Sequence, residues 1–84
     1  MRTKIYDTNS PNSVRIYIPF LVNVDEVVVK RNSDGIKIRE ATIMDKKTYK
    51  VNCNGFGIAF EGAKDLIGEY DVEKDGDYFH LVKV

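Results

Sequence analysis

Two side chains in this sequence are of types that often perform covalent or acid–base chemistry: the single cysteine, Cys53, and the single histidine, His80. A cysteine nucleophile needs a base that generates the thiolate and a third group that orients this base. The sequence shows neither, although it does not give the distance between the two residues. Both alternate with apolar or aromatic neighbours, as in strands with one buried face, which favours structural roles. We therefore expect no catalytic residues and no enzymatic activity.

Two short motifs partly resemble ligand-binding loops. Residues 71–76, Asp-Val-Glu-Lys-Asp-Gly, begin like a calcium loop, but position 12 of that loop needs a glutamate and falls on Val82 here. Residues 54–57, Asn-Gly-Phe-Gly, lack the Lys-Ser/Thr of a phosphate-binding loop. Hairpin turns explain both segments, so we expect no metal, no cofactor and no small-molecule substrate.

Charge is distributed unevenly along the chain. Residues 1–50 contain ten Lys/Arg and six Asp/Glu, and residues 51–84 contain three and seven, so a net charge of zero combines +4 and −4. The candidate basic face comprises Arg15, Tyr17, Lys30, Arg31, Lys37 and Arg39. Its cations suit phosphates or an acidic partner, and its tyrosine could stack on a base or ring. The alternative is an ordinary solvated sheet face.

The second half carries a candidate acidic strand, in which Glu69, Asp71 and Glu73 share one face. Alternate residues of a strand lie roughly 6–7 Å apart, close to the phosphate spacing along one DNA strand. Such a row could occupy a basic groove on another protein, or pair with the basic half of a second copy. A solvated strand face is again the alternative.

The elements that must position these residues are predicted to be strands. The apolar residues are mainly Val, Ile, Tyr and Phe, which favour sheet over helix. Alternating or apolar segments at 14–18, 24–31, 36–44, 49–53, 56–60, 69–73 and 78–84 are separated by turn residues. The sequence predicts an all-β fold, a small antiparallel barrel or sandwich of seven or eight short strands. At most one short helix is expected, near residues 61–67, and Gly68 would end it.

Three turns are predicted to make hairpins. Residues 32–35, Asn-Ser-Asp-Gly, join two strands, and Asn54-Gly55 is the strongest short hairpin signal in the chain. Residues 74–77 form the third turn. The 84 residues make a single domain, in which residues 12–42 and 54–84 could be a duplicated strand–hairpin unit. The alternative is that any two β-hairpins look alike in composition.

The expected compartment is the cytoplasm. One cysteine cannot form an internal disulfide, so nothing suggests an oxidising environment. The first residues contain no apolar run typical of a secretion signal. No stretch of about 20 apolar residues could cross a bilayer, so a membrane partner is not expected.

The order of motifs in the first half resembles a known family. Residues 13–19, Ser-Val-Arg-Ile-Tyr-Ile-Pro, are a basic and apolar strand ending in Ile-Pro, and residues 25–29 and 34–39 follow as a hairpin. This order is similar to that of the AbrB/MazE-type swapped-hairpin barrels, which are DNA-binding regulators and antitoxins. Residues 66–72 with Asp75-Gly76 have a similar pattern in the second half.

The chain departs from this family after the Ile-Pro strand, where only residues 20–23 take the place of a short helix. The resemblance implies a barrel that binds DNA through its N-terminal basic strand. It also implies Arg2, Lys4 and Arg15 as candidate phosphate contacts, and an obligate dimer.

Two functions follow from these patterns. The first is a non-enzymatic small protein that acts by protein–protein contacts through a charged face, as an inhibitor or adaptor of the kind encoded by phages and other mobile elements. The second is an AbrB/MazE-like DNA-binding regulator or antitoxin. Overall neutrality and a pI of about 6.6 favour the first. The expected partners are thus a protein, a second copy of the chain, or nucleic acid.

Overall fold

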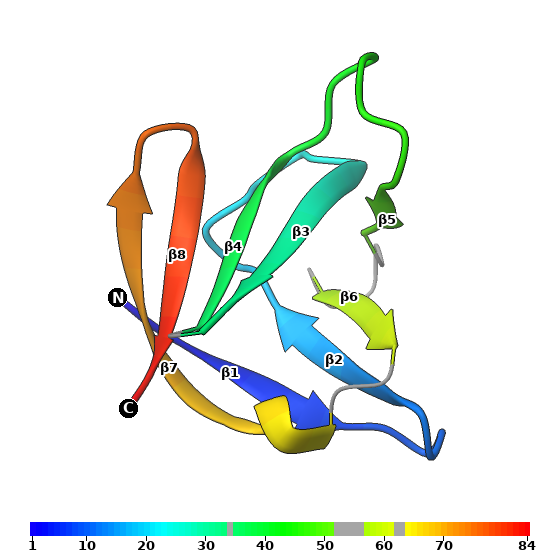
Figure 1. Ribbon diagram of the computed structural model, residues 1–84, viewed down its shortest axis with the longest axis vertical. Helices are drawn as coiled ribbons and strands as arrows, with labels where there is room; N and C mark the ends of the chain where they lie inside the picture. Colours follow the sequence, from blue (N-terminus) through cyan, green and yellow to red (C-terminus); the bar gives the residue numbers. More distant parts are fainter. Residues whose placement is uncertain (34, 52–56, 62–63) are drawn as a thin grey trace.

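The computed structural model describes residues 1–33, 35–51, 57–61 and 64–84 (Figure 1). These residues form strands and one short 3₁₀ turn, as the composition predicts. The strands are β1 (Arg2–Asp7), β2 (Ser13–Tyr17), β3 (Glu26–Asn32), β4 (Gly35–Glu40), β5 (Tyr49–Lys50), β6 (Gly57–Glu61), β7 (Gly68–Asp75) and β8 (Tyr78–Lys83). The turn, η1, spans Lys64–Leu66.

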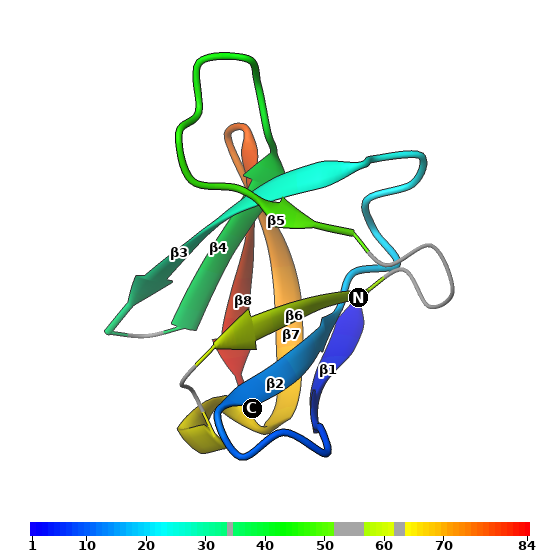
Figure 2. The same cartoon turned by 90° about the vertical axis from the view of Figure 1, so that its right-hand side faces the viewer.

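All strands belong to one antiparallel sheet that curls into a nearly closed barrel. Their order is β5-β3-β4-β8-β7-β1-β2-β6. The two end strands, β5 and β6, come side by side in both views (Figures 1 and 2). Tyr49 of β5 and Phe60 of β6 meet across this seam, with ring centroids 5.2 Å apart. The barrel is thus closed by an aromatic contact between the ends of the sheet, which confirms the predicted fold class.

The core is built by the alternation that marks strands in the sequence. Inward positions of successive strands are fully buried, as for Val14 and Ile16 on β2 or Ile36 and Ile38 on β4. The buried cluster consists of Ile5, Val14, Ile16, Ile18, Val27, Ile36, Ile38, Ile58, Leu66, Tyr70 and Leu81. Aliphatic β-branched residues dominate it, as the pleated inner surface of a small barrel favours.

Several elements differ from their predicted bounds. β1 was not predicted, although Thr3 and Ile5 alternate as its inward residues. β4 ends at Glu40 instead of continuing to Met44. The predicted helix is the single turn η1, since so short a segment gains few helical hydrogen bonds. Its Leu66 is buried, and the Leu66 carbonyl accepts a hydrogen bond of 2.6 Å from the Tyr70 hydroxyl.

Two of the predicted hairpins are present. β3 pairs with β4 up to Asn32 opposite Gly35, and β7 pairs with β8 up to Asp75 opposite Tyr78. Gly35 is required by close packing, because a Cβ there would lie 1.9 Å from the carbonyl oxygen of Leu81 on β8. The Asn54-Gly55 turn lies outside the described residues. Within the described residues, β5 pairs with β3, and β6 pairs with β2.

The two halves of the chain interlock. The β3–β4 hairpin of the first half pairs with β8 of the second, and the β7–β8 hairpin lies between β4 and β1 of the first half. The hairpin registers also correspond: Val29 opposite Ile38 has its counterpart in Val72 opposite Leu81, 43 positions later. If β1, β2, β3 and β4 are exchanged with β5, β6, β7 and β8 in that order, every strand pairing maps onto another pairing except β1–β2. That pair maps onto the β5–β6 seam. Duplication of residues 12–42 and 54–84 stays a prediction, which this arrangement motivates.

Candidate functional site

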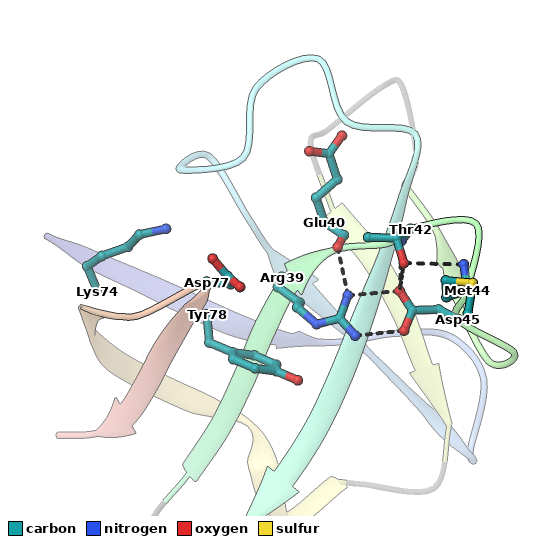
Figure 3. Close-up of a pocket in the computed structure, with 8 residues that line it drawn as sticks. All are labelled: Arg39, Glu40, Thr42, Met44, Asp45, Lys74, Asp77 and Tyr78. Atoms are coloured by element: carbon teal, nitrogen blue, oxygen red, sulfur yellow. Dashed lines mark hydrogen bonds and ion pairs between the residues drawn. The ribbon is translucent and has the colours of Figure 1, made fainter.

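One end of the barrel carries an open depression of about 700 Å³ (Figure 3). Three segments form it: the end of β4, loop 41–48 between β4 and β5, and the β7–β8 turn. Its lining residues are Arg39, Glu40, Thr42, Met44, Asp45, Lys74, Asp77 and Tyr78. Loop 41–48 and the β7–β8 turn project at this end beyond the other strands (Figure 2).

Two lining residues of the depression, Arg39 and Asp45, form an ion pair. The Arg39 Nη1 and Nη2 atoms donate hydrogen bonds of 2.8 Å and 2.6 Å to the two oxygens of the Asp45 carboxylate. Only 20% and 16% of the two side chains are exposed. The pairing with Arg39 holds the pKa of Asp45 well below its usual range, assisted by the Thr42 amide, and Asp45 in turn raises the pKa of Arg39. Both charges therefore persist at any physiological pH.

Asp45 also organises loop 41–48. Its carboxylate accepts hydrogen bonds from the Thr42 amide at 2.7 Å and from the Thr42 hydroxyl at 3.1 Å. The Asp45 amide donates to the Thr42 carbonyl at 3.1 Å, which closes the turn. Ile43 and Met44 at its tip are 100% and 84% exposed. The loop thus holds two large apolar side chains in solvent on a fixed backbone.

Beside the loop lies a basic surface that we call the Tyr78 face, comprising Lys30, Lys37, Arg39 and Tyr78. The Lys30 Nζ atom and the Arg39 Cζ atom each lie 5.4 Å from the centroid of the Tyr78 ring. Hydrogen bonding from Arg39 first, and from Lys30 second, lowers the pKa of Tyr78. Lys30 and Lys37 are directly opposite on β3 and β4, so this face is predominantly cationic.

Arg31, a fourth predicted cation of these strands, lies elsewhere. It forms an ion pair with Asp65 of η1, at the end of the barrel where β3 and β4 meet in their hairpin. Successive residues of a strand point to opposite faces of the sheet. Arg31 lies opposite the inward residue Ile36, whereas Lys30 and Lys37 face outward. Arg31 therefore closes the barrel end and does not belong to the Tyr78 face.

Arg15 and Tyr17 lie on β2, a surface separated from the Tyr78 face by β7 and β1 in the sheet order. There they join two residues of β1: Lys4, which the family resemblance implies as a phosphate contact together with Arg15, and Tyr6, which was not predicted. Tyr6 is directly opposite Arg15. The signal in the sequence was the repeated pattern of a cation two positions before a tyrosine, at 4–6 and at 15–17. The predicted basic face is thus two surfaces.

The acidic strand faces outward as predicted but has cationic neighbours. Asp71 accepts a hydrogen bond of 3.1 Å from the Arg2 Nε atom, and Glu69 lies opposite Lys4. The end of β7 is similar, since Lys37 donates to Asp75 at 2.7 Å and thereby lowers the pKa of Asp75. The ion pairs Arg2–Asp71, Arg31–Asp65, Lys37–Asp75 and Lys64–Asp7 each join the two halves of the chain. Much of the opposite charge of the halves is therefore matched within one molecule.

The candidate catalytic pair has no described geometry. Cys53 lies outside the described residues. His80 is half-buried on β8, opposite Lys37 on one side and Glu73 on the other. Within the described ranges, no group of three His, Cys, Asp or Glu side chains is placed to hold a metal ion. In the same ranges, no helix has the length and apolar character needed to cross a membrane.

Comparison with known proteins gives no match to a family model, to a curated protein or to a solved structure. The fold and site therefore define the class of the molecule, a small nearly closed antiparallel barrel with a projecting apolar loop. The relation to AbrB/MazE-type proteins stays a prediction.

Proposed function

We propose that this chain is a non-enzymatic binding module that recognises a protein partner, as an inhibitor or adaptor. The surface used would be the tip of loop 41–48 together with the adjoining Tyr78 face. The observation that carries the proposal is the exposure of Ile43 and Met44, at 100% and 84%, on a loop whose base is fixed by Asp45.

The energetics favour a protein partner for this tip. Burying one large aliphatic side chain in an apolar pocket is worth roughly 1.5–3 kcal/mol, and two such residues supply a useful part of a binding free energy. A loop already held in one conformation loses little entropy on binding. Ile43 and Met44 therefore have the character of interface anchors that enter a pocket on a partner.

The surroundings of the tip define the chemistry of that partner. Lys46 and Lys47 follow the tip in the loop, and both are exposed. Lys30 of the Tyr78 face, on β3, adds a further positive charge. An apolar pocket with an acidic rim would complement this arrangement, and the rim charges would mainly accelerate association and set specificity.

Quantitative co-purification from the native host tests the proposal. The double variant Ile43→Ser/Met44→Ser should lose at least ~90% of a specific co-purifying protein, because about 3 kcal/mol or more of apolar burial is removed. Val22→Ser is the matched control, because Val22 is 64% exposed in the loop between β2 and β3. Retention of the same proteins by the double variant would refute the role of the loop.

A further inference from the structure

A second surface, the outer face of β1 and β2, has a different composition from the loop. Lys4 and Tyr6 point outward on β1, since the residues that alternate with them, Thr3 and Ile5, are buried. Arg15 and Tyr17 point outward on β2, where Val14 and Ile16 are buried. We call the set Lys4, Tyr6, Arg15 and Tyr17 the Tyr17 platform; β1 and β2, which carry it, run side by side with β6 next to β2 (Figure 2).

The register arranges the platform as alternating rings and cations. Tyr6 lies directly opposite Arg15, and the same register continued by two residues brings Lys4 toward Tyr17. Lys4 Nζ also lies 5.4 Å from the centroid of the Tyr6 ring. Tyr6 and Tyr17 are therefore diagonal neighbours, roughly 7–8 Å apart for adjacent antiparallel strands, each with a positive charge beside it.

The rings of the platform are accessible. Tyr6 is 43% exposed and Tyr17 is 36% exposed. On the adjoining strand, Gly57 lies opposite Tyr17 and Ala59 lies opposite Arg15. Residues this small do not rise above the sheet, and the stem of Arg15 lies over Gly57, where an added Cβ would come within 3.3 Å of the Arg15 Cγ atom.

The cations of the platform are available to a ligand. In the described part of the chain, neither Lys4 nor Arg15 belongs to an ion pair, in contrast to Arg2, which is held by Asp71. Glu69 lies opposite Lys4 on β7 but forms no ion pair with it among the described residues. The platform therefore carries two unneutralised charges next to two exposed aromatic faces.

We propose that the Tyr17 platform binds single-stranded nucleic acid. Two successive unstacked bases would lie on the rings of Tyr6 and Tyr17, and the phosphates between and beside them would contact Arg15 and Lys4. Stacking of bases on sheet-borne aromatic side chains, with cations along the backbone, is a general mode of recognising single strands. A duplex fits less well, because its bases keep their faces covered by stacking. This site is independent of loop 41–48 and does not rest on the proposed protein partner.

The geometry also fixes the expected salt dependence. Each phosphate contact to a single strand contributes about −0.7 to the slope of log affinity against log salt concentration. Two contacts, from Lys4 and Arg15, give a slope of about −1.4. Replacing Glu69 by Gln should strengthen binding, because it removes the negative charge opposite Lys4.

Fluorescence anisotropy with labelled oligothymidine and oligouridine of about 12 nucleotides tests the proposal on the full chain. Tyr17→Ala should weaken binding by roughly tenfold, and Tyr17→Phe should stay within about twofold, because a phenyl ring still stacks. Arg15→Ala should weaken binding and make the salt slope less steep. Lys30→Ala and Tyr78→Ala, on the other surface, are the matched controls for Arg15→Ala and Tyr17→Ala and should leave binding unchanged.

Three results would overturn the proposal. They are no binding by the wild-type chain at low salt, equal losses for the platform and control variants, and a preference for duplex over single-stranded competitor. Circular dichroism of each variant separates loss of binding from loss of folding, and Arg15→Ala, with its predicted weaker binding and shallower salt slope, keeps the proposal testable if Tyr17→Ala does not fold. A normal result in the Ile43/Met44 co-purification assay would show that any failure here concerns the platform alone.

Discussion

Arg39 and Asp45 form a two-pronged ion pair that ties the end of β4 to a loop six residues further along the chain, with contacts of 2.8 Å and 2.6 Å. Without this pair, residues 41–48 would be a plain connection between strands. With it, the loop becomes a fixed support that presents Ile43 and Met44 to solvent. The ion pair therefore gives a local structure to the surface proposed to bind a protein.

Replacing Asp45 by Asn should loosen loop 41–48 while the barrel remains folded. The amide cannot reproduce the paired charge, so the hydrogen bonds of Arg39 weaken. We expect faster proteolytic cleavage between residues 41 and 48 at unchanged far-ultraviolet circular dichroism. Asp77→Asn is the control, since Asp77 lies in the β7–β8 turn of the same depression. Equal cleavage of the Asp45 variant and the wild type would contradict the role assigned to the pair.

Stability should fall in acid because of Asp45 and Asp75. Interactions with Arg39 and Lys37 lower the pKa of these carboxyls below the ordinary 3.8. Their contribution is complete above pH ~4 and is lost as the pH falls through the lowered values, since the unfolded chain then binds more protons. Denaturant unfolding from pH 7 to pH ~2 measures the effect. A double Asp45→Asn/Asp75→Asn variant should show a flatter acid limb, and an identical limb would contradict the assignment.

Gly35→Ala should destabilise the barrel far more than Gly76→Ala. A Cβ at Gly35 would lie 1.9 Å from the carbonyl oxygen of Leu81, whereas one at Gly76 meets nothing within 4 Å. Gly76 has a φ of 61°, so alanine there costs about 1–2 kcal/mol for the left-handed backbone alone. We expect a larger loss at Gly35, measured by urea unfolding, because β4 and β8 must separate. Equal losses would show that the hairpin does not pack as closely as described.

A circular permutant tests the interlocked arrangement of the halves. The first and last residues both bond to β7, as the Val72 amide donates to Met1 and the Val84 amide donates to Glu69. Joining the ends by a short linker and opening the chain within loop 41–48 preserves every strand pairing. We expect a cooperatively unfolding permutant that has lost the apolar tip as a binding surface. A permutant that fails to fold, while one opened at Gly76 folds, would argue against two equivalent units.

Much of the fold could be predicted because the alternation of apolar and polar residues that marks a strand depends only on neighbouring positions in the sequence. Ile16 and Ile38 are buried where the two-residue period places them, and the Gly76 hairpin forms at its turn residues. The seam between β5 and β6 could not be predicted, because Tyr49 and Phe60 meet only after the whole sheet has curled. The position of Arg31 could not be predicted for the same reason, because its pairing with Asp65 depends on where η1 lies in the folded chain.

The candidate sites were harder to predict for a related reason. The residues of the predicted basic face, apart from Arg31, are outward positions on separate strands, and the sheet order puts Arg15 and Tyr17 far from Lys30 and Lys37. The apolar character of Ile43 and Met44 predicts a strand that continues to residue 44, whereas β4 ends at Glu40 and both residues lie at the loop tip. The deciding feature is the contact of Asp45 with Arg39, which depends on a turn.

Site-specific photo-crosslinking tests the central claim most directly. A crosslinking residue at position 43 should give one discrete adduct with a host protein, and the same residue at position 22 should not. The adduct at position 43 should also disappear when unlabelled wild-type chain competes, but persist when the Ile43→Ser/Met44→Ser variant competes. Adducts of the same pattern from both positions, or none from position 43, would contradict recognition of a protein through this loop.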